Sequence, residues 1–187
     1  MLARENPFRI AQVRRFRYLL SEQEWQKLYD DWCANDCRGA IIGPHGSGKT
    51  TSLEDFAARF GKRLPSVVHW RCHRGDRRIP QWLWSRLKSK PTPVLLLDGL
   101  EQLSRTEQFR LRIRARKLPG ILVTTHTPRL YPTVLACQSR FAVLEQMVRQ
   151  LLVGHVQPST SDLTALFSRH QGNIREALLE LYDSYSV

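Results

Sequence analysis

Residues 43–50 read GPHGSGKT, and this stretch decides which fold the whole chain is expected to adopt. It fits the pattern G-x-x-x-x-G-K-[ST], whose glycines permit a tight turn that points successive backbone N–H groups into an anion-sized hollow. Lys49 is placed to reach the outer phosphates of a nucleotide, and the Thr50 hydroxyl is placed to hold Mg²⁺. The predicted nucleotide-binding residues are Gly43, Pro44, His45, Gly46, Ser47, Gly48, Lys49, Thr50 and Thr51.

The residues on either side of this loop support the same interpretation. An apolar run that includes Ala40, Ile41 and Ile42 comes directly before it and predicts a strand over about 38–42. A helical pattern follows and extends to about Phe60. The N-terminus of that helix would face the phosphates, where its dipole favours negative charge. The alternative is a chance glycine-rich turn, but strand, loop and helix occur in the required order.

Strand-like and helix-like segments alternate along most of the chain. We predict a helix beginning at the Ser21–Glu24 capping box and further helices over 49–60, 80–88 and 102–118. The predicted strands are residues 38–42, 67–70, 94–98, 121–125 and 141–144. This alternation indicates an α/β fold with a parallel five-stranded sheet sandwiched by helices. Only helical patterns follow Gln146, so we expect a nucleotide-binding core over 1–145, with 1–37 as a helical lead-in, and a short helical lid over 146–187.

Two acidic residues lie where a nucleotide site would need them. Asp98 ends the apolar run 94–97, and a carboxylate at that place can hold Mg²⁺ opposite Thr50. Glu101 could polarise the attacking water. Each residue also has an ordinary structural explanation, since Asp98 could serve as a turn residue and Glu101 could open a helix, where the dipole favours a carboxylate.

Polar residues also end the next predicted strand. One hydroxyl of Thr124 and Thr125 is expected to face the γ-phosphate, with Thr125 preferred. Threonine is favoured at strand ends for propensity reasons as well. His126 could orient water, although a lone histidine near a strand end more commonly has a structural role.

Charge is the unusual feature of the composition. The formal net charge is +12 and the isoelectric point about 10.2, with arginines concentrated in 71–78 (RCHRGDRR) and 105–117 (RTEQFRLRIRARK). Such a charge favours nucleic acid or another polyanion, but a solvated basic surface or contact with acidic neighbouring subunits would explain it equally well. No apolar run approaches the roughly 18 residues of a membrane span, and the start lacks an apolar signal-peptide core, so a cytoplasmic location is expected.

The four cysteines do not have the spacing of a zinc site. Cys33 and Cys37 would share a helix face, and Cys72 lies between His69 and His73. Neither group matches the paired C-x₂-C or the combined C-x₂-C/H-x₃₋₅-H spacing of a zinc site. Reduced, partly buried thiols are the expected state.

The order of these motifs resembles that of the AAA+ ATPase superfamily over nearly the whole chain. The shared features are the phosphate loop, a strand ending in Asp98, a Thr-ended strand, Ser139-Arg140-Phe141 and the segment GNIREA at 172–177. The resemblance implies that Arg175 is the sensor-2 residue of the lid and that Thr125 is sensor 1. It also implies that Arg140 is an arginine finger acting on a neighbouring subunit, and hence that the chain associates with itself or with an AAA+ partner.

Two further segments, one near the N-terminus and one around Asp98, refine this resemblance. Asn6-Pro7-Phe8 is similar to the start of small AAA+ proteins of the secretion-ATPase and transposition-helper type, whose N-terminal segment packs near the adenine. The stretch LLLDGLEQL at 95–103 resembles instead the NACHT branch, whose members are often slow switches.

The resemblance implies ATP and Mg²⁺ as cofactors, ATP hydrolysis, and nucleotide-dependent assembly or remodelling of a partner such as DNA. Three alternatives stay open from the sequence. They are a regulatory nucleotide switch without significant turnover, a P-loop small-molecule kinase, and a nucleic-acid-binding module with a vestigial loop.

Overall fold

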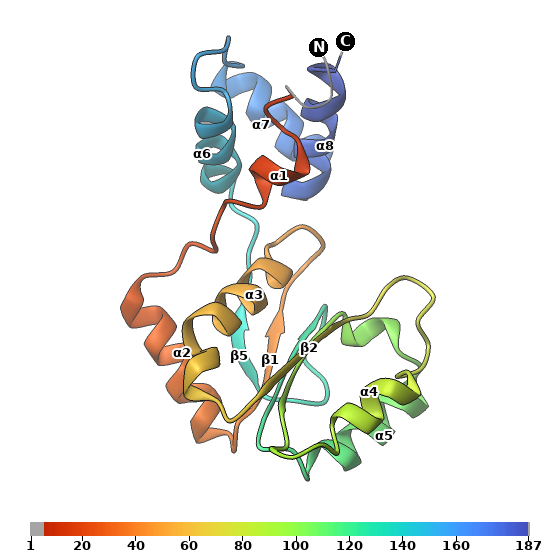
Figure 1. Ribbon diagram of the computed structural model, residues 1–187. Helices are drawn as coiled ribbons and strands as arrows, with labels where there is room; N and C mark the ends of the chain where they lie inside the picture. Colours follow the sequence, from red (N-terminus) through yellow and green to blue (C-terminus); the bar gives the residue numbers. More distant parts are fainter. Residues whose placement is uncertain (1–5, 187) are drawn as a thin grey trace. The chain divides into compact units, whose positions relative to one another are not determined.

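A computed structural model describes residues 6–186, and the chain divides into two compact units (Figure 1). The first unit contains the residues up to Arg17, Pro44–Gly48 and the residues from Gln138 onward. The second contains Tyr18–Gly43 and Lys49–Cys137. Each unit is described separately below. The expectation of a start without a signal peptide rests partly on residues 1–5, which lie outside the described residues.

The second unit is built on the predicted sheet. Its five strands are all parallel and lie in the order β2-β3-β4-β1-β5. The strands are β1 (Arg38–Ile42), β2 (Val67–Arg71), β3 (Val94–Asp98), β4 (Ile121–Thr125) and β5 (Thr133–Ala136). Every residue of β3 and β4 is buried, as expected for inner strands covered on both faces.

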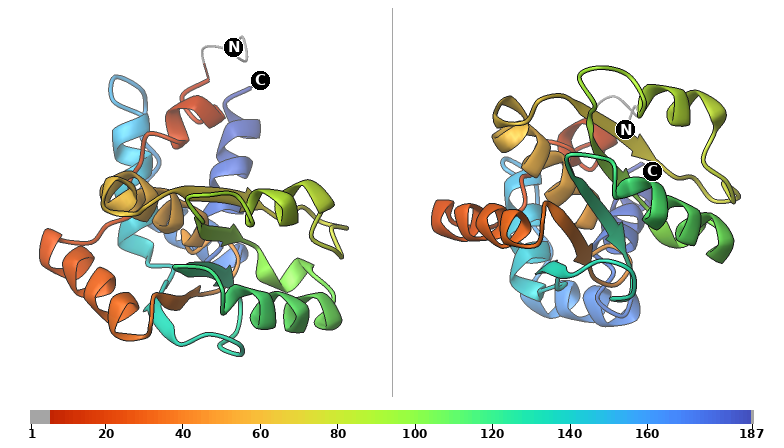
Figure 2. Two further views of the ribbon diagram at one scale, coloured as in Figure 1. Left: turned by 60° about the horizontal axis from the view of Figure 1, so that its bottom comes forward. Right: turned by 90° about the horizontal axis from the view of Figure 1, so that it is seen from below.

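Helices cover both faces of this sheet (Figure 2). On one face, α2 (Glu22–Ala34) and α3 (Lys49–Phe60) form a core cluster with Val94 and Leu96 of β3. On the other, α4 (Gln81–Arg86) and α5 (Arg105–Ala115) form a cluster with Leu95 and Leu97. Alternate β3 side chains thus supply opposite cores, which is the period of two that a strand imposes. Short 3₁₀ helices occupy Gly61–Arg63 and Leu100–Gln102.

The predicted helices are present, with small shifts at their ends. α2 begins at the predicted capping box, in which the Ser21 hydroxyl accepts from the Glu24 N–H and the Glu24 carboxylate accepts from the Ser21 N–H. The helix predicted from residue 80 begins at Gln81, because Pro80 is its N-cap and not its first helical residue. The basic helix predicted over 102–118 is shorter and begins after the Ser104 N-cap.

Trp32 fixes the packing of α2 onto the sheet. Its indole is fully buried, and its N–H donates to the Ile121 carbonyl at 3.0 Å. The ring lies against two glycines, so that a Cβ atom added at Gly120 would be 2.6 Å from the ring and one added at Gly39 would be 2.8 Å from it. Glycine is therefore needed at both positions for steric reasons.

The predicted fifth strand is wrong. Phe141–Leu144 forms the first turn of α6 (Phe141–Leu151), and Leu144, Val148 and Leu152 are buried at the four-residue spacing of a helix. The fifth strand is instead β5, a four-residue edge strand that pairs with β1.

The first unit is helical within the described residues. It contains α1 (Ile10–Val13), α6, α7 (Thr160–Arg169) and α8 (Ile174–Ser184) around a separate apolar core that includes Phe8, Leu144 and Leu163. The Asn6 amide donates to the Tyr182 carbonyl at 2.8 Å, and the Phe8 ring packs edge-on against Tyr185 at a centroid distance of 5.2 Å. The Asn6-Pro7-Phe8 segment is therefore held against α8.

Candidate functional site

The loop predicted to bind phosphate connects β1 to α3, which begins at Lys49. Gly46 and Gly48 have φ values of 72° and 88°, in the left-handed region that favours glycine. The Ser47 hydroxyl donates to the Pro44 carbonyl at 2.9 Å, which closes the turn. The Lys49 ammonium donates to the Gly43 carbonyl at 2.8 Å, so the lysine folds back over the start of the loop.

Asp98 is the centre of the hydrogen-bond network at the ends of the strands. One of its carboxylate oxygens accepts from the Thr50 hydroxyl at 2.9 Å. The other accepts from the Thr124 hydroxyl at 2.6 Å. The side chain is buried, with 6% of the residue surface exposed. The two residues that the sequence pattern assigns to a metal ion, Thr50 and Asp98, are thus in direct contact.

The two threonines that end β4 have different environments. The Thr124 hydroxyl, besides donating to Asp98, accepts from the Gly99 N–H at 2.8 Å and so positions the start of the turn after β3. Thr125 is also buried, and its carbonyl accepts from the Gly43 N–H at 3.3 Å. Its side chain lines a cavity of about 170 Å³ together with Glu101. Thr124, the less favoured of the pair in the sequence, is the one that contacts Asp98.

Glu101 and His126 link this cavity to the loop. His126 Nε2 lies 3.0 Å from one oxygen of Glu101, and His126 Nδ1 lies 3.1 Å from the Gly43 carbonyl. The second oxygen of Glu101 is buried and has no hydrogen-bond partner among residues 6–186. Burial lowers the pKa of Lys49, while the charges of Glu101, Cys137 and Asp98 act in the opposite direction.

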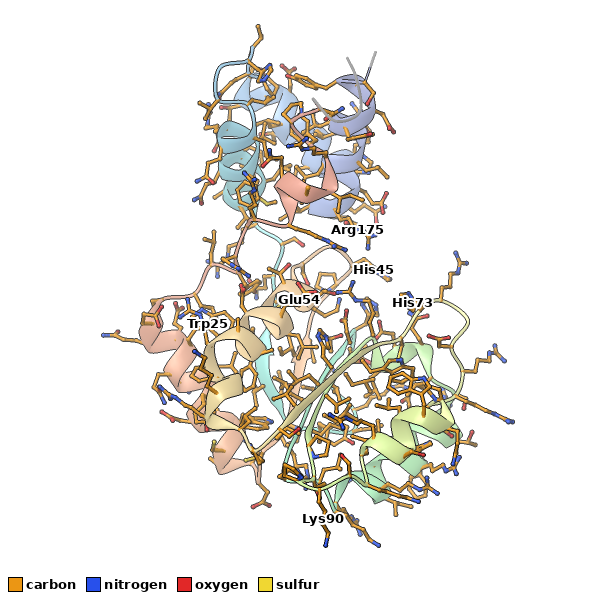
Figure 3. All side chains as sticks on the ribbon, in the orientation of Figure 1. Trp25, His45, Glu54, His73, Lys90 and Arg175 are labelled. Carbon is orange, nitrogen blue, oxygen red and sulfur yellow. The ribbon has the colours of Figure 1, made fainter. Side chains whose placement is uncertain are left out.

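Sequence reasoning missed Arg71. Its guanidinium donates to Asp98 at 2.9 Å, through the same oxygen that Thr50 contacts, and to Glu54 at 2.9 Å (Glu54 is labelled in Figure 3). Arg71 ends β2 and pairs in register with Asp98. The signal was that Arg71 directly follows one predicted strand and Asp98 ends another, and neighbouring parallel strands end at the same edge of a sheet. The contact could be predicted only if β2 was known to lie beside β3.

Part of the loop belongs to the first unit, together with Asn173. A Cβ atom added at Gly46 would lie 2.0 Å from the Asn173 amide oxygen, so a larger residue would collide there. Asn173 is the N-cap of α8, and its side chain accepts from the Glu176 N–H at 3.3 Å. Pro44, Ser139 and Gly172 line an open hollow of about 510 Å³ in the same unit.

The two predicted functional arginines also belong to the first unit. Arg175 is the second residue of α8 (Figure 3), and Arg140 is the N-cap of α6, so it does not precede a strand as the sequence suggested. Both side chains are exposed, and neither makes a hydrogen bond or ion pair with another residue of 6–186. Within the second unit, the structure brings together Lys49, Thr50, Asp98 and Glu101.

The cysteines are free thiols. Burial raises the pKa of Cys72 to about 12, so this thiol stays protonated at neutral pH. Within the described part of the chain, no three histidine, cysteine or acidic side chains are grouped as a metal site would require. None of the helices described is both long and apolar enough to cross a lipid bilayer.

Comparisons with known proteins agree with this architecture. No protein-family model matches the chain, and no curated protein sequence does. Among solved structures, two substituted forms of RuvB from Thermotoga maritima are similar, with 15% and 14% identity and TM-scores of 0.60 and 0.53. The alignments cover 91% and 87% of this chain but only 65% and 61% of the RuvB chains, so this chain spans less than two thirds of their length. Likeness at this identity establishes the fold alone, which is that of a P-loop NTPase with a parallel sheet.

Proposed function

We propose that this chain binds ATP with Mg²⁺ at the loop of residues 43–50 and hydrolyses it. The observation that carries the proposal is the 2.9 Å contact between the Thr50 hydroxyl and the Asp98 carboxylate, which are 48 residues apart in sequence. The loop pattern alone fits many glycine-rich turns. An acidic strand end in contact with the threonine of the pattern is much more specific.

The residues present fit a nucleotide and its metal ion. Thr50 and Asp98 offer oxygen donors, which Mg²⁺ prefers, and such sites usually complete the shell with water and substrate phosphates. Lys49 is a partly buried cation whose charged form would be stabilised by a neighbouring phosphate. Mg²⁺, when bound, would neutralise charge on the outer phosphates. Thr50 and Asp98 would hold it, and Lys49 with the N–H groups of the loop would bind the phosphates.

Glu101 is the proposed general base. Its unpartnered oxygen and its place on the 170 Å³ cavity leave it able to accept a proton from a water molecule. His126 holds the other oxygen of Glu101 and thereby orients the carboxylate. Thr125, on the wall of the same cavity, would orient the water or the γ-phosphate.

Arg175 and Arg140 are proposed to complete the site. In this scheme residues 1–145 are the nucleotide-binding core and 146–187 act as a lid, with Arg175 reaching the phosphates from the lid. Arg140 would act on the site of a neighbouring copy, which requires self-association. The exposure of both guanidiniums supports this, since each is free to meet a ligand or another subunit.

Equilibrium binding of Mg-ATP tests the proposal, with Lys49→Ala as the decisive variant. We expect its affinity to fall roughly ten- to hundredfold, because a hydrogen bond to a charged group contributes about 1.5–3 kcal/mol. Lys62→Ala, which removes an exposed lysine just beyond α3, is the matched control and should bind as the unmodified chain does. Equal affinity in the Lys49 and Lys62 variants would refute a nucleotide site at this loop.

Phosphate release tests the hydrolytic part. Asp98→Asn and Glu101→Gln should abolish turnover, and Glu101→Gln should keep Mg-ATP binding because Glu101 is not proposed to hold the metal. Arg140→Ala should lower the rate only in samples concentrated enough to assemble. Unchanged turnover of the Arg140 variant in those concentrated samples would exclude Arg140 from the site.

A second candidate is a regulatory switch that binds nucleotide with negligible turnover. Arg71 supports it, because this guanidinium already occupies the Asp98 oxygen that faces Thr50, and it would compete with a metal ion there. A single release of phosphate per chain, without steady turnover, would favour the switch. Faster turnover in Arg71→Ala would show that this ion pair restrains the enzyme.

A further inference from the structure

The two arginine-rich stretches of the sequence come together in the second unit. The Ser104 N–H donates to the Arg77 carbonyl at 3.0 Å, and the Ile79 N–H donates to the Glu107 carboxylate at 3.3 Å. These bonds hold the 77–79 segment against the first turn of α5. The exposed basic residues collected there are Arg77, Arg78, Arg105, Arg110, Arg112, Arg114, Arg116 and Lys117.

The outer face of α5 also carries apolar side chains. Phe109 is 60% exposed and Ile113 is 49% exposed, one helical turn apart on the same face. Leu111 and Ala115 of the same helix are buried in the core, so the helix is fixed with Phe109 and Ile113 facing solvent. Helical spacing places Arg105, Arg112 and Arg116 on that face beside Phe109. Large exposed apolar side chains within a basic surface are typical of interaction sites.

Little negative charge offsets these arginines. The acidic residue of α5 is Glu107, which is buried and pairs with Arg110 at 3.5 Å. Arg110 and Arg114 also lie over the Trp84 ring, at 5.6 and 4.6 Å from its centroid, so their guanidiniums are held in place by cation–π contact. The remaining arginines of the face therefore present charge that is not neutralised locally.

We propose that this surface, which we call the α5 face, binds nucleic acid. It consists of Arg77, Arg78, Arg105, Phe109, Arg112, Ile113, Arg116 and Lys117. Its arginines would contact backbone phosphates, to which the planar guanidinium offers two parallel hydrogen bonds. Phe109 would stack on an unpaired base, as exposed aromatic residues do in single-strand binding surfaces.

The chemistry of the α5 face favours nucleic acid over an anionic membrane. Arginine outnumbers lysine by five to one in residues 105–117, and bidentate phosphate contact is the property that distinguishes arginine. A membrane-surface helix would need a broad apolar face, whereas here Phe109 and Ile113 are the exposed large apolar residues of α5. The proposal does not depend on nucleotide binding at the loop.

Fluorescence anisotropy with a labelled 20-nucleotide single strand, over a salt series, tests this proposal. Arg112→Gln with Arg116→Gln should reduce the slope of log affinity against log salt by about 1.4, because each phosphate contact on a single strand contributes about 0.7. Phe109→Ala should weaken binding at least about fivefold through lost stacking. Arg14→Gln with Arg15→Gln removes the same charge from the first unit and should leave the slope nearly unchanged.

The outcomes separate this proposal from its rivals. Equal salt slopes for the α5 double variant and the Arg14/Arg15 control would overturn it, and so would binding to phosphatidylserine vesicles without binding to the oligonucleotide. A duplex of the same sequence, bound as tightly as the single strand and insensitive to Phe109→Ala, would overturn the stacking role.

The α5 double variant should bind Mg-ATP normally, so failure at the phosphate loop and failure at the α5 face give different results. Circular dichroism confirms that each variant is folded.

Discussion

At the scale of single residues, the candidate site depends on Asp98. Its two oxygens receive hydrogen bonds from Thr50, Thr124 and Arg71. The sequence predicted Thr50 and Asp98, because the loop pattern and an apolar strand with an acidic end are local signals. It did not predict Arg71 or select Thr124, because those contacts depend on which strands are neighbours in the sheet. That order is set by tertiary packing.

Gly120 should be among the least replaceable residues of the second unit. Gly120→Ala would place a methyl carbon 2.6 Å from the nearest carbon of the Trp32 ring. Because this is an overpacking clash, we expect a loss of about 1–3 kcal/mol in the free energy of unfolding. Gly61→Ala is the control, since nothing lies within 4 Å of its Cβ position, and this variant should be neutral or slightly stabilising. Urea denaturation measures both. Similar stabilities in the two variants would contradict the packing described for Trp32.

Lys49 should give the loop a pH dependence. Burial lowers its pKa below the ordinary value of 10.5, so on the alkaline side the lysine loses its proton earlier than an exposed lysine. Affinity for Mg-ATP should therefore fall as pH rises through the lowered pKa. The free energy of unfolding of the nucleotide-free chain changes with pH in the opposite direction. Between the lowered pKa of the folded chain and the ordinary value of the unfolded chain, the unfolded chain binds more protons, so stability rises with pH. Measuring Mg-ATP affinity and the free energy of unfolding as functions of pH checks the direction of each effect. Lys49→Met should show neither pH dependence.

At the scale of elements, four of the five predicted strands are confirmed and the fifth is wrong for an identifiable reason. Residues 141–144 form a short apolar run, which cannot be assigned to strand or helix by periodicity alone. Only the longer spacing of Leu144, Val148 and Leu152 reveals a helix. β5 offers no buried run, because it is an edge strand whose end residues are exposed, and its pairing with β1 is long-range.

The N-terminus of α8 should affect stability and nucleotide affinity in different ways. Asn173→Ala removes the cap and should lower the free energy of unfolding by about 1 kcal/mol. Asn173→Asp keeps the cap, since aspartate caps about as well as asparagine, but it places a negative charge against Gly46 of the loop. We therefore expect the aspartate variant to be stable yet weaker in Mg-ATP binding. Parallel denaturation and binding curves test this, and unimpaired binding by Asn173→Asp would exclude phosphates near Asn173.

At the scale of the whole molecule, the two units have separate apolar cores, and residues of the phosphate loop belong to both. Ligand binding stabilises a folded protein by about 2.7 kcal/mol at one hundred times its dissociation constant. For a chain of this length, that corresponds to a rise in Tm of roughly 5–10 °C. Mg-ATP should produce such a shift by differential scanning calorimetry. Lys49→Ala at the same ligand concentration should show little of it, and an equal shift in that variant would place the bound nucleotide elsewhere.

The division of the chain at residues 17/18, 43/44, 48/49 and 137/138 limits how the protein can be dissected. Neither unit corresponds to a continuous stretch of polypeptide, so a gene fragment ending near residue 137 would carry the segment 44–48 without Asn173, which lies against Gly46. Truncation would thus leave the glycine-rich segment 44–48 without its contact to Asn173. A circularly permuted chain with new ends in an exposed turn would keep residues 44–48 and Asn173 in one polypeptide, but no single cut isolates either unit.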